Sequence, residues 1–215
     1  MKTISRGANP KVFERTLIYI PIIHTEADMG GLSESVRRAT LQKLGLKSWK
    51  RKVDLTNRMW SEIEQVIDRL DLPPYEKVRL YQDGLPVCGR EAELVGDLAR
   101  AESRNHRLLF RLMERGATIM GTESSELLVE EYQLIKQIMA AGDTNEAAKI
   151  EARQKALSDS ILKRRDQFIA DRINSTLCEG ETGVLFLGML HSLGDRLHRD
   201  IRVIYPINRP CNKGR

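Results

Sequence analysis

The chain contains two uninterrupted apolar runs, and each of them ends at a histidine. The first run covers residues 16–23 and is followed by His24, and the second covers residues 184–190 and is followed by His191. Short apolar runs without polar alternation are typical of strands buried on both faces, as in parallel sheets. Ligands of open α/β sheets lie beyond the carboxyl ends of the strands. Two histidines at that point predict a functional site assembled from distant parts of the chain.

Strand and helix signals alternate along the rest of the sequence. Further strands are expected over residues 78–82, 117–120 and 201–205. Helices are expected over residues 33–45, 49–70, 90–115, 124–142 and 144–178. This alternation is typical of a parallel or mostly parallel sheet with helices on its faces. We therefore expect an α/β fold, a single domain over residues 1–207, with a mostly parallel central sheet of about five strands flanked by helices and a helical insertion. The basic tail, residues 208–215, is expected to be disordered.

Composition indicates a soluble globular protein. Of the 215 residues, 41% are hydrophobic and 30% are charged, and no apolar run approaches the roughly 18 residues of a membrane span. The N-terminal residues lack the apolar stretch of a signal peptide. The three cysteines show no CxxC spacing, so neither a disulfide framework nor a thiolate zinc cluster is expected. We expect a cytoplasmic protein with no membrane partner.

Charged side chains follow the carboxyl ends of the expected strands. These are His24 with Glu26 and Asp28, then Asp83, then Glu123, then His191 with Asp195. Two histidines and several carboxylates at one edge are typical of a metal site or a general acid–base site. We expect His24, Glu26 and His191 to act in catalysis and to ligate a divalent metal such as Mn, Zn or Fe. Asp83, Glu123 and Asp195 are expected to bind substrate.

A buried arginine supports the same site independently. At 100° per residue, Arg165 falls in the middle of the apolar stripe of the helix expected over residues 144–178. The helix from Arg165 to Cys178 rises about 20 Å. The strand from Val184 to Leu190 climbs back about 20 Å. Arg165 is therefore expected level with His191, where an anion must compensate its charge.

The C-terminal motifs resemble those of a known group. Residues 165–173, followed by an apolar strand and then by Gly188, His191 and Gly194, are similar to the C-terminal half of the TraB/Tiki group, which is related to the erythromycin-esterase-like and ChaN-like proteins. The group's first motif reads Gly-x-x-His or Glu-x-x-His, whereas this chain has Pro21 in the first position. The resemblance implies an α/β fold and hydrolysis of esters or peptides, in some branches with a divalent metal. It also implies that His24 and His191 are site histidines.

The leading hypothesis is a hydrolase that acts on a small-molecule or peptide substrate. Water, activated by a histidine or by a bound metal, would attack an ester, amide or phosphoryl centre. Arg165 would then offset the charge that develops on the substrate oxygen, or orient a carboxylate.

Two alternatives remain open from the sequence. Residues 37–58 hold eight Lys or Arg, among them Lys50, Arg51 and Lys52, against one acidic residue. Such a run is most often a solvated face, but it also fits a non-catalytic module that binds an anionic partner or nucleic acid. The apolar stripes of residues 49–70 and 94–112 could mediate homo-oligomerisation, although packing onto the chain's own sheet is favoured.

Overall fold

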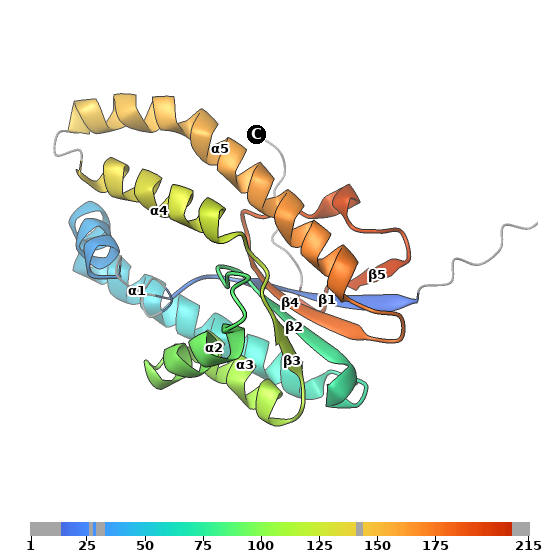
Figure 1. Cartoon of the computed structure of the whole chain (residues 1–215). Coiled ribbons are helices and arrows are strands. Elements are labelled where there is room, and N and C mark those ends of the chain that lie inside the picture. The colour runs from blue at the N-terminus through green and yellow to red at the C-terminus, as the bar shows by residue number, and fades with distance from the viewer. Residues whose placement is uncertain (1–13, 26–27, 29–32, 141–143, 208–215) are drawn as a thin grey trace, which may run out of the picture.

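The computed structural model describes residues 14–25, 28, 33–140 and 144–207. Ten α-helices and β-strands are present in these residues, and Figure 1 shows how they are arranged. They are β1 (Arg15–Ile22), α1 (Ser33–Arg69), β2 (Val78–Gln82), α2 (Glu91–Arg100), α3 (Arg104–Glu114), β3 (Thr118–Met120), α4 (Ser125–Ala140), α5 (Thr144–Thr176), β4 (Thr182–Gly188) and β5 (Ile201–Ile204). The connections between the described elements include the short 3-10 helices η2 (Tyr75–Lys77) and η3 (Gly194–Arg196). The tail over residues 208–215 lies outside the described residues.

The five strands form one parallel sheet in the order β3-β2-β4-β1-β5. Ile22 at the end of β1 pairs with Gly188 at the end of β4, and Gln82 at the end of β2 pairs with Phe186. The predicted α/β fold with a parallel sheet of about five strands is therefore confirmed. This register brings the carboxyl ends of the three central strands to the same edge.

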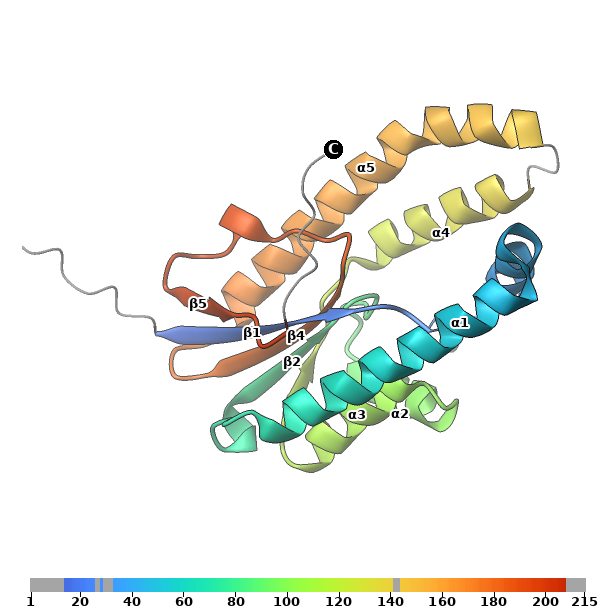
Figure 2. The same ribbon diagram turned by 180° about the vertical axis from the view of Figure 1, so that it is seen from behind.

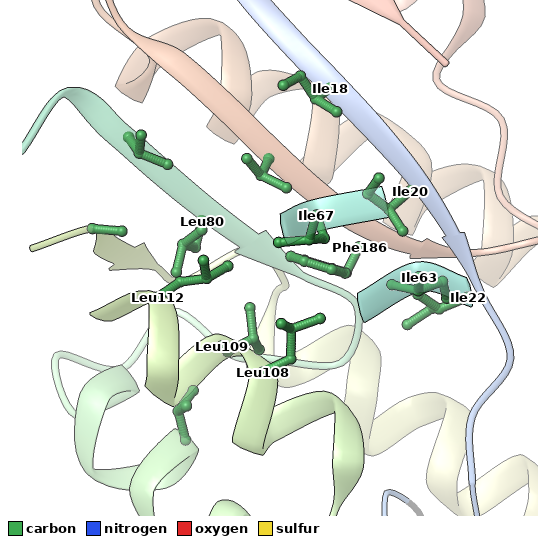
Figure 3. Packing of buried hydrophobic residues seen from close by; sticks show 14 of the residues in the cluster. Ile18, Ile20, Ile22, Ile63, Ile67, Leu80, Leu108, Leu109, Leu112 and Phe186 are labelled. Atoms are coloured by element: carbon green, nitrogen blue, oxygen red, sulfur yellow. The ribbon is translucent and has the colours of Figure 1, made fainter. Parts of the chain in front are cut away.

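Helices α1, α2 and α3 cover one face of the sheet (Figures 1 and 2). On this face Ile20 and Phe186 of the sheet pack with Ile63 of α1 and Leu109 of α3 (Figure 3). These side chains come from alternate positions along each strand, because successive residues of a strand point to opposite faces.

Helix α5 covers the opposite face. Tyr19 of β1 and Leu185 of β4 pack there with Ile169 and Ile173 of α5. Because the central strands are buried on both faces, both of their side-chain rows are apolar. This explains why the sequence around them shows no polar alternation.

The two predicted helical stripes pack on the chain's own sheet. Trp60 and Ile67 of the first stripe are buried, as is Leu112 of the second. The indole Nε1 of Trp60 donates a hydrogen bond to the carbonyl of Ile23 at 3.2 Å, which ties α1 to the end of β1. These parts of the stripes are therefore not available for a coiled coil. The predicted helix end at Gly45 appears as a kink within α1, where this residue has φ 75° and ψ 163°.

The single helix predicted over residues 90–115 is wrong, because the chain forms α2 and α3 there. Glu102 adopts a positive φ of 65° between the two helices, and Ser103 caps α3 by accepting a hydrogen bond from the backbone N–H of His106. Serine is a favoured N-cap residue, and this local signal overrides the continuous apolar spacing.

Helix α1 and the antiparallel pair α4 and α5 both extend beyond the carboxyl edge of the sheet (Figures 1 and 2). The two views place them on opposite sides of that edge. Any ligand bound at the strand ends is therefore flanked by helices. Within the described residues, no helix combines the length and the apolar character needed to cross a membrane.

Candidate functional site

The carboxylate of Asp83, directly after β2, is the centre of a polar cluster at the carboxyl edge. Its Oδ2 accepts hydrogen bonds from His24 Nε2 at 3.1 Å and from the backbone N–H of Gly188 at 2.9 Å. Nε2 of His191 lies 3.6 Å from the same oxygen. The two histidines, 167 positions apart in the chain, therefore meet at one carboxylate, as expected for residues that follow parallel strands of one sheet.

Arg165 reaches this cluster from α5 and is buried, as predicted. Its Nη2 donates to Asp83 Oδ1 at 2.8 Å and to Glu123 Oε1 at 2.6 Å. Its Nε donates to Glu123 Oε2 at 3.2 Å, and its Nη1 donates to Glu131 Oε2 of α4 at 2.7 Å. Three carboxylates thus accept hydrogen bonds from the guanidinium. This favours a role in orienting carboxylates over the expected contact with a substrate oxygen, because each of its three nitrogens already has a carboxylate partner.

His191 is held from the other side by Asp166. Its Nδ1 donates to Asp166 Oδ1 at 2.7 Å, and the second oxygen of Asp166 accepts the backbone N–H of Ser192 at 3.1 Å. A carboxylate on Nδ1 fixes the tautomer and the orientation of a histidine ring. Nε2 of His191 is therefore directed to Asp83.

The charges of the cluster shift its pKa values in different directions. Burial raises the pKa of the Asp83 carboxyl, but the hydrogen bond from His24 and the charges of His191, His24 and Arg165 outweigh this effect, and the pKa lies well below its usual range. Burial lowers the pKa of Arg165, but Glu123 and the other carboxylates outweigh this effect and raise it. Asp83 and Arg165 therefore stay ionised.

The pKa values of Glu123 and His24 are raised, whereas that of Asp83 is lowered. Both groups are therefore shifted toward their protonated forms. Burial raises the pKa of the Glu123 carboxyl, and the hydrogen bond and charge of Arg165 only partly oppose this. Burial lowers the pKa of His24, but its hydrogen bond to Asp83 and the charges of Asp83 and Asp28 outweigh this effect and raise it. His24 is also the most exposed member of the cluster, with 36% of its side chain accessible.

The residues best placed to hold a metal differ from the expected set. Asp83, Glu123 and His191 each offer a ligand atom, and these atoms lie within 4.8 Å of one another. Two ligands of one ion, each bound at about 2.1 Å, lie about 3.0–3.4 Å apart, close to the 3.6 Å between His191 Nε2 and Asp83 Oδ2. Two carboxylates and an imidazole suit Mn, Zn or Fe. The expected ligand Glu26 lies outside the described residues.

The remaining predicted site residues separate into two groups. Asp83 and Glu123 belong to the cluster, but both are buried and bonded to Arg165, so the expected direct hydrogen bonds to a substrate are not supported. Asp195 is exposed in η3, and among the described residues no hydrogen bond or ion pair joins it to the cluster. Its inclusion in the site is therefore not supported.

Two members of the cluster were not expected from the sequence. Asp166 immediately follows Arg165. The rises of helix and strand that place Arg165 level with His191 also place Asp166 near His191. Glu131 comes from α4, which packs along α5, and no strand-end or stripe signal marks it.

A second polar network joins the segment after β1 to the start of α3. Asp28 Oδ1 accepts a hydrogen bond from Ser103 Oγ and lies 3.4 Å from His106 Nδ1, and its Oδ2 accepts from the backbone N–H and hydroxyl of Thr25 at 2.7 and 2.8 Å. Because Thr25 follows His24, this network anchors the backbone that carries the exposed histidine.

Comparison with known protein families, with curated proteins and with solved structures finds no match for this chain. Function is therefore inferred from the geometry of the site.

Proposed function

We propose that the chain is a hydrolase in which His24 and Asp83 form the acid–base pair. The observation that carries this proposal is the hydrogen bond between the accessible ring of His24 and the buried, ionised carboxylate of Asp83. A histidine oriented by a buried carboxylate is suited to general base catalysis. The TraB/Tiki resemblance of the motifs around Arg165 and His191 points to the same reaction class.

The reaction would proceed by attack of water on an ester or amide carbonyl, or on a phosphoryl centre. His24 takes a proton from the water molecule while the water oxygen bonds to the electrophilic centre. The protonated His24 then gives that proton to the leaving group as the scissile bond breaks. Asp83 stabilises the imidazolium that forms between these steps. Arg165 holds Asp83 and Glu123 in place.

A divalent metal fits the donor set of Asp83, Glu123 and His191. Such an ion would make a water molecule acidic enough to supply hydroxide near neutral pH. Asp166 would then orient the imidazole ligand through Nδ1, as carboxylates commonly do for metal-bound histidines. Because ligands must be deprotonated, the raised pKa of Glu123 predicts weaker metal binding as the pH falls.

A screen of ester, amide and phosphoester substrates tests this proposal. His24→Gln and Asp83→Asn are each expected to lower kcat by about 10²- to 10⁴-fold. The matched control is His198→Gln, because His198 is an exposed histidine that contacts Arg15 at 3.3 Å, at the start of β1. Equal activity in all four proteins would contradict the proposal.

Metal content is measured on protein purified without a histidine tag. The wild type is expected to retain a transition metal that Asp83→Asn and His191→Gln lose. A wild type that binds neither Mn²⁺ nor Zn²⁺ in calorimetry would rule out the metal-assisted form, while the His24–Asp83 pair would remain testable through the substrate screen.

A second candidate function rests on the outer face of α1. Four basic residues line a shallow hollow there together with Asp54 and Leu55, and they are Lys47, Lys50, Arg51 and Arg58. At 100° per residue, Lys47, Arg51 and Arg58 lie about 140–180° around α1 from Trp60, and Lys50 lies about 80° from it. Lys52 is also exposed but lies about 160° around the helix from Lys50 and is not part of the lining. The basic residues of this face are therefore directed away from the core.

We propose that this basic face, which includes Lys50 and Arg51, binds the phosphate backbone of nucleic acid. Binding of duplex RNA or DNA should weaken steeply with salt, and Lys50→Glu/Arg51→Glu should reduce both the affinity and the salt dependence. Lys163→Glu, at an exposed position of α5, is the matched control. Equal nucleic-acid affinity of Lys50→Glu/Arg51→Glu and of Lys163→Glu would rule out nucleic-acid binding by this face.

A further inference from the structure

Two exposed apolar residues directly precede His191 of the candidate site in the chain and follow Gly188, which hydrogen-bonds to Asp83. Leu190 is 81% exposed, the highest value among the large hydrophobic residues exposed in the described chain, and its neighbour Met189 is 42% exposed. Both lie in the turn between β4 and His191, where the backbone N–H of His191 donates to the carbonyl of Gly188 at 3.1 Å. They are the two central residues of this turn.

The turn is fixed at both ends by the site itself. Gly188 donates its backbone N–H to Asp83, and His191 donates from its ring to Asp166. Central turn positions favour Gly, Pro, Asn, Asp or Ser, so the turn does not itself require methionine and leucine. Ligand sites combine apolar side chains with a few polar groups, so these two exposed side chains next to the polar cluster suit contact with an apolar part of a ligand.

The charge of the cluster argues for an uncharged substrate. Four carboxyl groups, those of Asp83, Glu123, Glu131 and Asp166, surround one guanidinium and two imidazoles. When no metal is bound, these carboxyl groups outnumber the permanent positive charge of Arg165, so the site favours a neutral ester or amide over an anionic phosphoester. Apolar contact with Met189 and Leu190 is then the binding interaction that remains for a neutral substrate.

We infer that Met189 and Leu190 form an acyl-binding rim, so that the substrate is a carboxylic ester or amide with an aliphatic acyl group. This inference rests on the proposed hydrolase function and names its substrate class. The acyl chain lies against the two side chains, and the carbonyl is directed to His24.

The experiment compares 4-nitrophenyl acetate, butyrate, hexanoate and octanoate as substrates. In the wild type, kcat/KM should rise with chain length. In Leu190→Ser the ratio of kcat/KM for octanoate to that for acetate should fall about tenfold, because a lost apolar contact of this size changes specificity by that order. The matched control is Leu46→Ser, because Leu46 is also exposed, at 60%, but lies on α1. It should keep the wild-type ratio.

A binding measurement separates this inference from the proposed function. With methyl-labelled methionine, the Met189 resonance should shift on addition of octanamide and not of acetamide. Hydrolysis without dependence on chain length would overturn the acyl-binding rim and leave the hydrolase intact. A Met189 shift in a protein that hydrolyses no ester or amide would support the rim and contradict the hydrolase. A wild-type dimer that Leu190→Ser dissociates would assign this surface to contact between copies and overturn the inference.

Discussion

Arg165 and Asp166 are consecutive residues of α5, and they hold the two halves of the candidate site. Arg165 binds Asp83 and Glu123, at the ends of β2 and β3, whereas Asp166 binds His191 after β4. Neighbouring residues of a helix lie about 100° apart around its axis, which lets the two side chains diverge to different strands. One turn of α5 therefore fixes the carboxylates of Asp83 and Glu123 relative to the imidazole of His191.

Removal of the guanidinium should destabilise the fold. Arg165→Gln leaves Glu123 and Asp83 buried without their cation, and loss of one member of a buried ion pair costs about 3–5 kcal/mol. The free energy of unfolding, measured in urea, should fall by an amount of this order. Adding Glu123→Gln should recover part of the loss, because one buried charge is then removed.

Arg164→Gln is the matched control for this measurement. Arg164 is an exposed neighbour that pairs with Glu130 at 2.9 Å on the surface, and such pairs contribute about 0–1 kcal/mol. Similar unfolding free energies for Arg164→Gln and Arg165→Gln would contradict a structural role for the buried guanidinium.

Much of this site could be predicted because it depends on the regular geometry of parallel strands and of helices. Parallel strands end at one edge, which placed His24, Asp83 and His191 together, and the rises of helix and strand placed Arg165 at their level. Both predictions hold. Neither of them needs knowledge of how helices pack.

The contributions of helix pairing and local capping could not be obtained in this way. Glu131 reaches Arg165 because α4 lies along α5, and the apolar stripe of one helix does not specify which polar residue of its neighbour it meets. The break before α3 depends on a single N-cap at Ser103, which competes with a continuous apolar spacing. Asp195 follows a strand end closely in sequence, but the turn into η3 carries it to the surface.

The contribution of His24 to stability should depend on pH. Its pKa in the folded chain is raised above the ordinary value of 6.5, so the folded chain binds the proton more tightly than the unfolded chain. The stabilising contribution is therefore fully present below pH 6.5 and is lost as the pH rises through the raised pKa. The difference in unfolding free energy between wild type and His24→Gln should be largest at pH 5.5 and should shrink by pH 8.5.

A proton NMR titration of the His24 ring gives the independent check. Its midpoint should lie above 6.5 in the wild type and fall in Asp83→Asn, because the hydrogen bond and the negative charge are then lost. A midpoint below 6.5 in the folded wild type would show that desolvation dominates and that the protonated ring does not stabilise the fold.

Asp28 should contribute to resistance against acid. Burial raises the pKa of this carboxyl, but hydrogen bonds from His106, Ser103 and Thr25 outweigh it and lower the pKa to about 2. Because the folded pKa lies below the ordinary 3.8, the contribution is present above pH 3.8 and is lost as the pH falls through about 2. By linkage it amounts to about 2 kcal/mol.

Acid unfolding of Asp28→Asn tests this contribution. The variant should be less stable than wild type at pH 5, and the difference should narrow toward pH 2. Asp54→Asn, at an exposed position of α1, is the control and should follow the wild-type curve. A constant difference between wild type and Asp28→Asn at every pH would mean that the carboxyl acts through packing and not through its charge.

The lack of a side chain at position 188 should matter for the position of Asp83. A Cβ atom built on Gly188 would lie 2.7 Å from Asp83 Oδ2, the oxygen that also accepts the Gly188 N–H. Gly188→Ala should therefore displace the carboxylate, lower the unfolding free energy by about 1–3 kcal/mol and reduce any activity that depends on His24. Gly96→Ala is the matched control, because a Cβ there meets nothing closer than 3.6 Å and alanine in the interior of α2 should stabilise by about 0.5–1 kcal/mol. A Gly188→Ala protein as stable and as active as the wild type would show that the Asp83 carboxylate can move without loss.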